Sequence, residues 1–294
     1  MPNSRLPILF SVAALLLAGG AYLHTKPAAM TSTQKETAYE RVIRTGILRC
    51  GYDVYEPSII LDPNTKKMSG IFYDLMNEVG KRLSLKVDWS TQVGYGVIPQ
   101  ELALNRIDAF CGVVWPTAAR ARMGSFSVPV YYSAVYVFTR ANDNRFDADY
   151  TKLNNPAYTV SIKDGDVAGS IAAADFPQTN HISIGEMAHT SQMLEDVATK
   201  KADATFNELV GFYNYSKTNP NKLKVVGRDK PPLRYFASTV MMGAEEYQLK
   251  TMIDVAIGEL IQSGFVEKLL QKYEGNRELY MRVGEPYKKL PNQP

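Results

Sequence analysis

Apolar residues recur along residues 72–83 at the three- and four-residue spacing of a helix that is buried on one face. The apolar positions are Phe72, Leu75, Met76, Val79 and Leu83. Residues 85–89 alternate between apolar and polar, as a strand does, and residues 107–114 form an apolar run that predicts a buried strand. Because helices and strands alternate, we expect a mostly parallel α/β sheet.

The second half of the chain repeats this alternation. Residues 104–110 resemble residues 199–206, because both segments end a helix and start a strand at an Asp-Ala pair. This similarity indicates two lobes that are built on one plan. We expect strands at 158–162, 202–206 and 238–242, and helices at 191–199, 208–215, 246–261 and 266–273.

The first 29 residues predict a segment that directs the chain to export. Arg5 precedes a mostly apolar run at 6–23, which contains small residues at 18–21. These features are typical of a secretory signal peptide, and the run is also long enough to stay as an uncleaved N-terminal anchor. Either outcome exports the rest of the chain to an oxidising compartment.

Composition and charge narrow the function classes. The chain is 45% hydrophobic and 21% charged, which is ordinary globular composition, and 33 Lys and Arg nearly balance 30 Asp and Glu. A nearly neutral chain lacks the basic surface that binds nucleic acid or an anionic membrane. The three His show no metal-ligand spacing, and the sequence has no phosphate loop or nucleophile elbow, so we expect no metal and no cofactor.

A series of short motifs follows in order along the chain. It consists of Ile47-Leu-Arg, Tyr55-Glu-Pro, Gly70 before Asp74-Leu, Ile107-Asp-Ala, Thr117-Ala-Ala-Arg120, Phe126-Ser-Val-Pro129-Val-Tyr131 and Gly264-Phe-Val-Glu-Lys268. Over about residues 38–275, the series resembles the amino-acid-type periplasmic solute-binding proteins, which are solute-binding family three of the type 2 periplasmic-binding fold.

The resemblance implies an α/β fold of two lobes joined by two hinge strands, which close on a ligand in the cleft. Lobe one would hold residues 38–137 and 242–280, lobe two residues 140–238, and residues 281–294 would form a C-terminal tail. The implied function is that of a monomeric periplasmic receptor without enzyme activity. It would capture a small organic solute, an amino acid or related carboxylate, and pass it to an inner-membrane ABC permease.

Two other functions fit the same fold. Some relatives are enzymes of the cyclohexadienyl dehydratase type with an acidic residue in the cleft, and Glu208 could act there as a general acid. The second alternative is a periplasmic sensor that delivers no solute, which an uncleaved anchor would favour.

The resemblance gives Arg120 and Glu208 the two charged roles in the cleft. Arg120 would hold the ligand carboxylate, because a guanidinium can bond both oxygens; the alternative is a surface Arg paired with a structural acid. Glu208 replaces the Asp that usually meets the ligand's amino group. The alternative for Glu208 is a first-turn residue that stabilises a helix N-terminus.

Tyr55, Tyr95 and Asp53 would line the lobe-one side of the cleft. The two rings correspond to aromatic positions that pack against an apolar side chain or a cation, and plain packing is the alternative. Asp53 lies in the same loop as Tyr55 and would meet a cationic end of the ligand, unless it is simply solvated.

Trp115 and Asp166 depart from the family pattern. Trp115 lies in the segment before Arg120, where members commonly carry small hydroxyl residues; it would either line the cleft or belong to the core. Asp166 follows Gly165 at a turn that often has Ser or Thr, and its carboxylate would repel a ligand carboxylate unless another cation intervenes. Backbone N–H groups at the following helix start could still donate to an anion. We therefore expect an unusual, larger or more apolar amino acid, or another small organic ion.

Cys50 and Cys111, the two cysteines of the chain, fall on strands that should be neighbours in lobe one. A disulfide can form there if the Cα atoms lie within about 7 Å of each other, and export favours it. The alternative is a pair of buried thiols.

Overall fold

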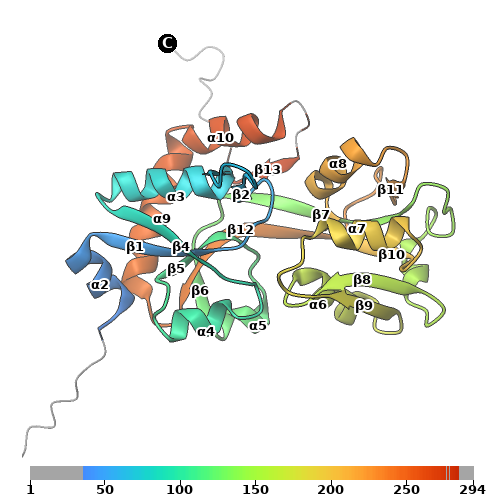
Figure 1. The fold of residues 1–294 in the computed structure, drawn as a ribbon, viewed down its shortest axis with the longest axis horizontal. Coiled ribbons are helices and arrows are strands. Elements are labelled where there is room, and N and C mark those ends of the chain that lie inside the picture. Colours follow the sequence, from blue (N-terminus) through green and yellow to red (C-terminus); the bar gives the residue numbers. More distant parts are fainter. Residues whose placement is uncertain (1–35, 276, 278, 285–294) are drawn as a thin grey trace, which may run out of the picture. The chain divides into compact units, whose positions relative to one another are not determined.

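The computed structural model describes residues 36–275, 277 and 279–284. Figure 1 shows two groups of strands and helices, one on each side of a pair of long strands. In the first group, β1 (Ile47–Tyr52) pairs in parallel with β4 (Lys86–Gln92) and with β5 (Ala109–Val114). In the second group, β8 (Thr159–Lys163) pairs in parallel with β9 (Asn180–Ile184) and with β10 (Ala204–Glu208).

The two long strands, β7 (Tyr131–Arg140) and β12 (Arg234–Gly243), connect these groups. β12 pairs with β5 at one end and with β7 at the other, and β7 continues to β10. These pairings are antiparallel. The expected parallel pairing therefore occurs only within each group, and the two connecting strands run antiparallel to the strands that they join. The arrangement is that of a two-lobed α/β fold with two connecting strands, as predicted.

Helices cover both groups. The first lobe carries α2 (Ala38–Thr45), α3 (Ile71–Arg82), α4 (Ile98–Ala103), α5 (Ala118–Ala121), α9 (Tyr247–Gln262) and α10 (Phe265–Glu274). The second lobe carries the short 3-10 helix η1 (Tyr150–Leu153), α6 (Val167–Asp175), α7 (Ser191–Ala198) and α8 (Leu209–Thr218). The short strands are β2 (Ile60–Leu61), β3 (Met68–Ser69), β6 (Gly124–Phe126), β11 (Leu223–Val225) and β13 (Tyr280–Arg282).

The helix predicted from apolar spacing at 72–83 is confirmed as α3. Phe72, Leu75, Met76 and Val79 are fully buried, which is the single buried face that the spacing requires. Burying a side chain of this size contributes about 1.5–3 kcal/mol, so this face fixes α3 on the sheet.

Two interactions fasten the strands that carry the cleft loops. Cys50 in β1 and Cys111 in β5 form a disulfide, with their Cα atoms 5.3 Å apart. Just before β5, the buried Asp108 accepts hydrogen bonds from the Arg41 side chain and from the backbone N–H and guanidinium of Arg49. A buried carboxylate needs such partners, and here they tie α2 and β1 to the start of β5.

Several predictions concern the ends of the chain. The predicted signal peptide or anchor at 1–29 lies outside the described residues, as do residues 285–294 of the expected tail. The described part of that tail begins inside β13, which pairs with β7. Within residues 36–275, 277 and 279–284, no helix has the length and apolar character that a membrane span needs.

Candidate functional site

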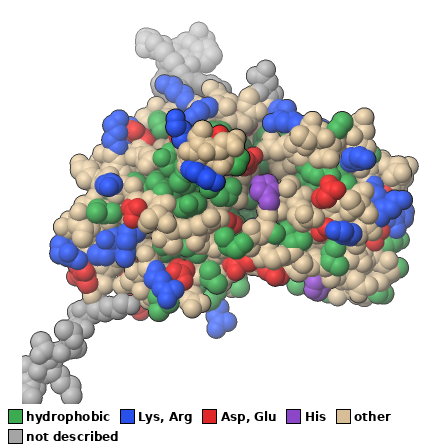
Figure 2. Space-filling view, viewed as in Figure 1, with side chains coloured by type: hydrophobic (Ala, Val, Ile, Leu, Met, Phe, Trp, Pro, Cys, Tyr) green, Lys and Arg blue, Asp and Glu red, His purple; other side chains and the backbone are tan. Residues whose placement is uncertain are grey.

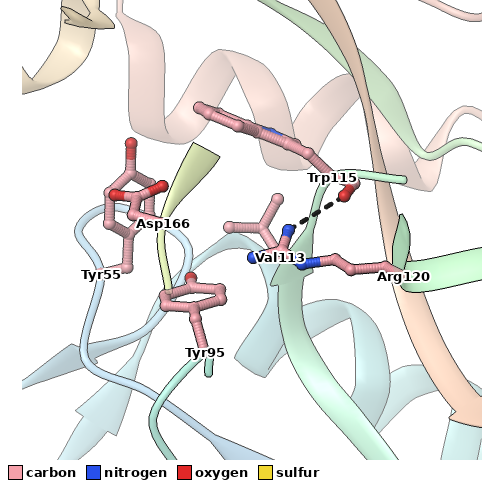
Figure 3. A pocket seen from close by; sticks show the side chains of 6 residues that line it. All are labelled: Tyr55, Tyr95, Val113, Trp115, Arg120 and Asp166. Carbon is pink, nitrogen blue, oxygen red and sulfur yellow. Dashed lines mark hydrogen bonds between the residues drawn. The ribbon is translucent and has the colours of Figure 1, made fainter. Parts of the chain in front are cut away.

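A pocket lies where loops of the first lobe meet the start of α6 in the second lobe (Figure 3). Its empty space is about 270 Å³, including the part open to solvent. The lining residues are Tyr55, Tyr95, Val113, Trp115, Arg120 and Asp166. Five of these come from the first lobe, on loops, at the end of β5 or on α5, and Asp166 alone comes from the second lobe. Five of the seven predicted site residues therefore meet at one pocket.

Arg120 enters this pocket from α5, a single helical turn whose start is capped by the Thr117 hydroxyl. Its guanidinium donates to two carbonyl oxygens, that of Trp115 at 3.0 Å and that of Gly165 at 2.7 Å. No carboxylate in the described part of the chain pairs with it. Burial lowers the pKa of Arg120, and Asp166 partly opposes this effect, but a guanidinium stays protonated in proteins. The pocket therefore contains a cation that has dipoles, but no anion, as partners.

Glu208 lies at the other side of the lobe interface. It ends β10 and stands at the N-cap position of α8, but its side chain makes no capping bond. The expected helix start at 208 is thus one residue early, and Glu208 does not stabilise the helix end by capping. Instead, the hydroxyl of Tyr55 in the first lobe donates to Glu208 Oε2. Burial raises the pKa of Glu208 to about 6, although bonds from Ser133 and Tyr55 lower it.

Asp166 is the N-cap residue of α6, and its carboxylate accepts the N–H of Val167. This N–H is therefore not free for an anion. Burial raises the pKa of Asp166, while Lys163 and Arg120 lower it. Figure 3 shows the Asp166 carboxylate beside the Tyr55 ring, with the Arg120 guanidinium across the pocket from both. The pocket thus has an acidic end near Tyr55 and a basic end at Arg120.

Aromatic rings form the remaining walls. Trp115 stacks on Phe236 of β12, with ring centroids 4.9 Å apart and planes tilted by 10°. Its Nε1 is buried and has no partner among the described residues. Burial raises the pKa of both Tyr55 and Tyr95, so both hydroxyls stay protonated. Trp115 therefore both lines the pocket and packs against a connecting strand. The sequence left lining and packing open as alternatives, and the side chain does both.

Asp53 does not line this pocket. Its carboxylate lies 3.4 Å from the ammonium of Lys163, the last residue of β8, and both side chains are buried. Asp53 is therefore already paired with Lys163, and it is buried rather than simply solvated. Sequence reasoning missed Lys163, because Lys is rarely buried and nothing in the strand Thr-Val-Ser-Ile-Lys marks its last residue as an exception.

Further contacts close the two lobes on each other. The Glu186 carboxylate of the second lobe accepts the N–H of Gly96 in the first. Gly165 has a positive φ of 72°, and a Cβ there would lie 2.6 Å from the Gly96 nitrogen. Only glycine permits both this backbone conformation and this approach. The Gly165 carbonyl thereby reaches Arg120, so the loop brings the second lobe onto the basic end of the pocket.

Comparisons with known proteins agree with this architecture. The profile of the bacterial extracellular solute-binding proteins, family 3, matches residues 48–276. The chain is 25% identical over 237 residues to the L-cystine-binding protein TcyA of Bacillus subtilis, covering 79% of this chain and 82% of that protein. It is 24% identical over 241 residues to a "Probable amino-acid ABC transporter-binding protein" of Haemophilus influenzae, covering 80% of this chain and 88% of that protein.

A solved structure with the same fold is that of the ancestral amino acid-binding protein AncCDT-1, a precursor of cyclohexadienyl dehydratase. The TM-score is 0.70 at 19% sequence identity, over 81% of this chain and 99% of that chain. At this identity, the likeness shows the fold alone. The two sequence relatives described above are named as binding proteins, which agrees with a solute-binding receptor.

Proposed function

Since this chain belongs to the bacterial extracellular solute-binding proteins, family 3, we propose that it captures an amino acid or a related small carboxylate in the pocket between its lobes. It would release the solute, chemically unchanged, to an ABC permease of the inner membrane. The names of the two relatives, which refer to cystine and to an amino-acid ABC transporter, support this substrate class and this partner.

The observation that carries the proposal is the unmatched guanidinium of Arg120. Its two described partners are carbonyl oxygens, which leave the positive charge of a half-buried guanidinium without an ion-pair partner. A ligand carboxylate would supply that charge, and a charge-assisted bond of this type contributes about 1.5–3 kcal/mol. This is the interaction that we assign to the ligand's α-carboxylate.

Glu208 and Asp166 support the other half of the ligand. Both acids raise the pKa of Tyr55: Glu208 accepts the Tyr55 hydroxyl, and Asp166 lines the pocket beside the Tyr55 ring, across from Arg120. Neither forms an ion pair with a described Lys or Arg. An ammonium has three donors and can bond both carboxylates, so we assign this end to the ligand's amino group.

We further propose that the protein works as a monomer after export to the periplasm. Acidic and basic side chains are interspersed over the face drawn in Figure 2. Such a surface favours a soluble, unassociated protein. Fractionation of expressing cells, followed by light scattering on the purified protein, tests both statements; cytoplasmic protein or a stable dimer would contradict them.

A thermal-shift panel of the common L-amino acids, polyamines and small organic acids tests the main proposal. We expect a concentration-dependent rise in Tm with at least one amino acid, because a ligand that binds only the native state stabilises it by mass action. A panel without any amino-acid hit would contradict the proposal. Turnover of arogenate or prephenate by the purified protein would show the enzyme alternative instead.

A further inference from the structure

A buried ion pair lies next to the pocket and is not part of its lining. It joins Lys163 at the end of β8 to Asp53 in the loop after β1, so it bridges the two lobes. The side chains are only 3% and 5% exposed. Two charges this deep are costly unless each neutralises the other, so each serves as the other's counterion.

Among the described residues, three groups contact the Asp53 carboxylate. Its Oδ1 accepts the N–H of Val54 at 2.9 Å and the side-chain amide of Gln92 at 3.3 Å, and its Oδ2 faces Lys163. A cationic ligand group could reach this carboxylate only by displacing the Lys163 ammonium.

Tyr95 connects the ion pair to the pocket. Its ring centroid lies 5.7 Å from the Lys163 ammonium and 5.9 Å from the guanidinium carbon of Arg120. The two other acids have no ion-pair partner among the described residues: Glu208 accepts the Tyr55 hydroxyl, and Asp166 lines the pocket, close enough to Lys163 and Arg120 for both to act on it electrostatically. The acids of the cleft therefore differ in what they offer a ligand: Asp166 lines the pocket without an ion pair, whereas Asp53 is already paired with Lys163.

We propose that Lys163 is a specificity-determining residue. It occupies the position at Asp53 where a second cationic group could otherwise bind, and it thereby restricts the cleft to amino acids with uncharged side chains. A side-chain guanidinium or ammonium would meet the like charge of Lys163 and would find Asp53 already neutralised. This inference rests on the proposed function, because it assumes that an amino acid occupies the pocket.

The test compares L-arginine with L-citrulline, which has a similar shape but no side-chain charge. Calorimetry would give the affinity of both for the wild type, for Lys163→Ala and for the double variant Asp53→Asn/Lys163→Ala. In Lys163→Ala, we expect L-arginine to gain at least about tenfold relative to L-citrulline, because the freed carboxylate can accept a charge-assisted bond. In the double variant we expect no such gain, since the accepting charge is gone.

The single variant leaves Asp53 buried without a counterion, which destabilises the fold. The variant Asp53→Asn therefore gives a second, independent measurement. It frees the Lys163 ammonium, so L-glutamate should gain at least about tenfold relative to L-glutamine. Unchanged ratios in Lys163→Ala and in Asp53→Asn would overturn the role of Lys163 while amino-acid binding stands. Absence of amino-acid binding by the wild type and by every variant would overturn the proposed function as well.

Discussion

The protonation of Glu208 makes a quantitative prediction about how ligand affinity depends on pH. If the ligand's ammonium bonds Glu208, the ionised carboxylate is the form that binds. With a pKa of about 6, this carboxylate is roughly one-tenth ionised at pH 5 and roughly nine-tenths ionised at pH 7. The affinity should therefore rise about tenfold between these two values, which corresponds to about 1.4 kcal/mol.

The stability of the unliganded protein should change in the opposite direction. Burial raises the pKa of Glu208 from its ordinary value of 4.5, so the folded state holds a proton more tightly than the unfolded chain does. The resulting stabilisation is present below the unfolded pKa and is lost as the pH rises through about 4.5 to 6. A shift of this size corresponds to about 2 kcal/mol in the free energy of unfolding.

Calorimetric titrations at pH 5, 6 and 7 measure the first effect, with the amino acid that gives the largest thermal shift. Denaturant titrations of the free protein over the same pH range, extended to pH 4, measure the second. Glu208→Gln keeps the side-chain size and removes the ionisation, so it should flatten this part of both profiles. The reasoning is refuted if the wild-type affinity is flat between pH 5 and 7, or if Glu208→Gln leaves its slope unchanged.

Two further predictions concern Arg120 and the disulfide. Arg120→Ala should weaken a carboxylate ligand by about 1.5–3 kcal/mol in calorimetry, roughly tenfold to a hundredfold in Kd, and an unchanged Kd would remove Arg120 from the site. The disulfide between Cys50 and Cys111 joins residues 61 positions apart, and a loop of this length corresponds to about 4 kcal/mol of unfolded-state entropy. The double variant Cys50→Ala/Cys111→Ala should therefore unfold at a clearly lower denaturant concentration, and an equal midpoint would contradict this stabilising role.

Local patterns in the sequence predict those helices and strands that bury the apolar residues of a single face. The helix expected at 72–83 occurs as α3 at Ile71–Arg82, because its apolar spacing directly encodes the buried stripe. The predicted start of α8 was less accurate, because the helix begins at Leu209 and not at Glu208. Glu208 is compatible with a first helical turn, but its bond to Tyr55, 153 positions away, accompanies an extended backbone at the end of β10.

The charges of the cleft show where prediction from sequence ends. Arg120 and Glu208 could be singled out because a family motif surrounds each of them. The pairing of Asp53 with Lys163 could not, since these residues are 110 positions apart and meet only when the two lobes come together. For the same reason, the sequence could not show that Asp53 is already neutralised, which changes the kind of ligand that we expect.

The central claim is that an amino acid lies between the two lobes, with its carboxylate on Arg120 and its ammonium near Glu208 and Asp166. A crystal structure of the complex with the best amino acid of the panel tests this most directly. We predict carboxylate oxygens within hydrogen-bonding distance of the Arg120 guanidinium and the ligand nitrogen within the same distance of a carboxylate of Glu208 or Asp166. A ligand bound outside this pocket, or bound in it with its carboxylate away from Arg120, would contradict the account.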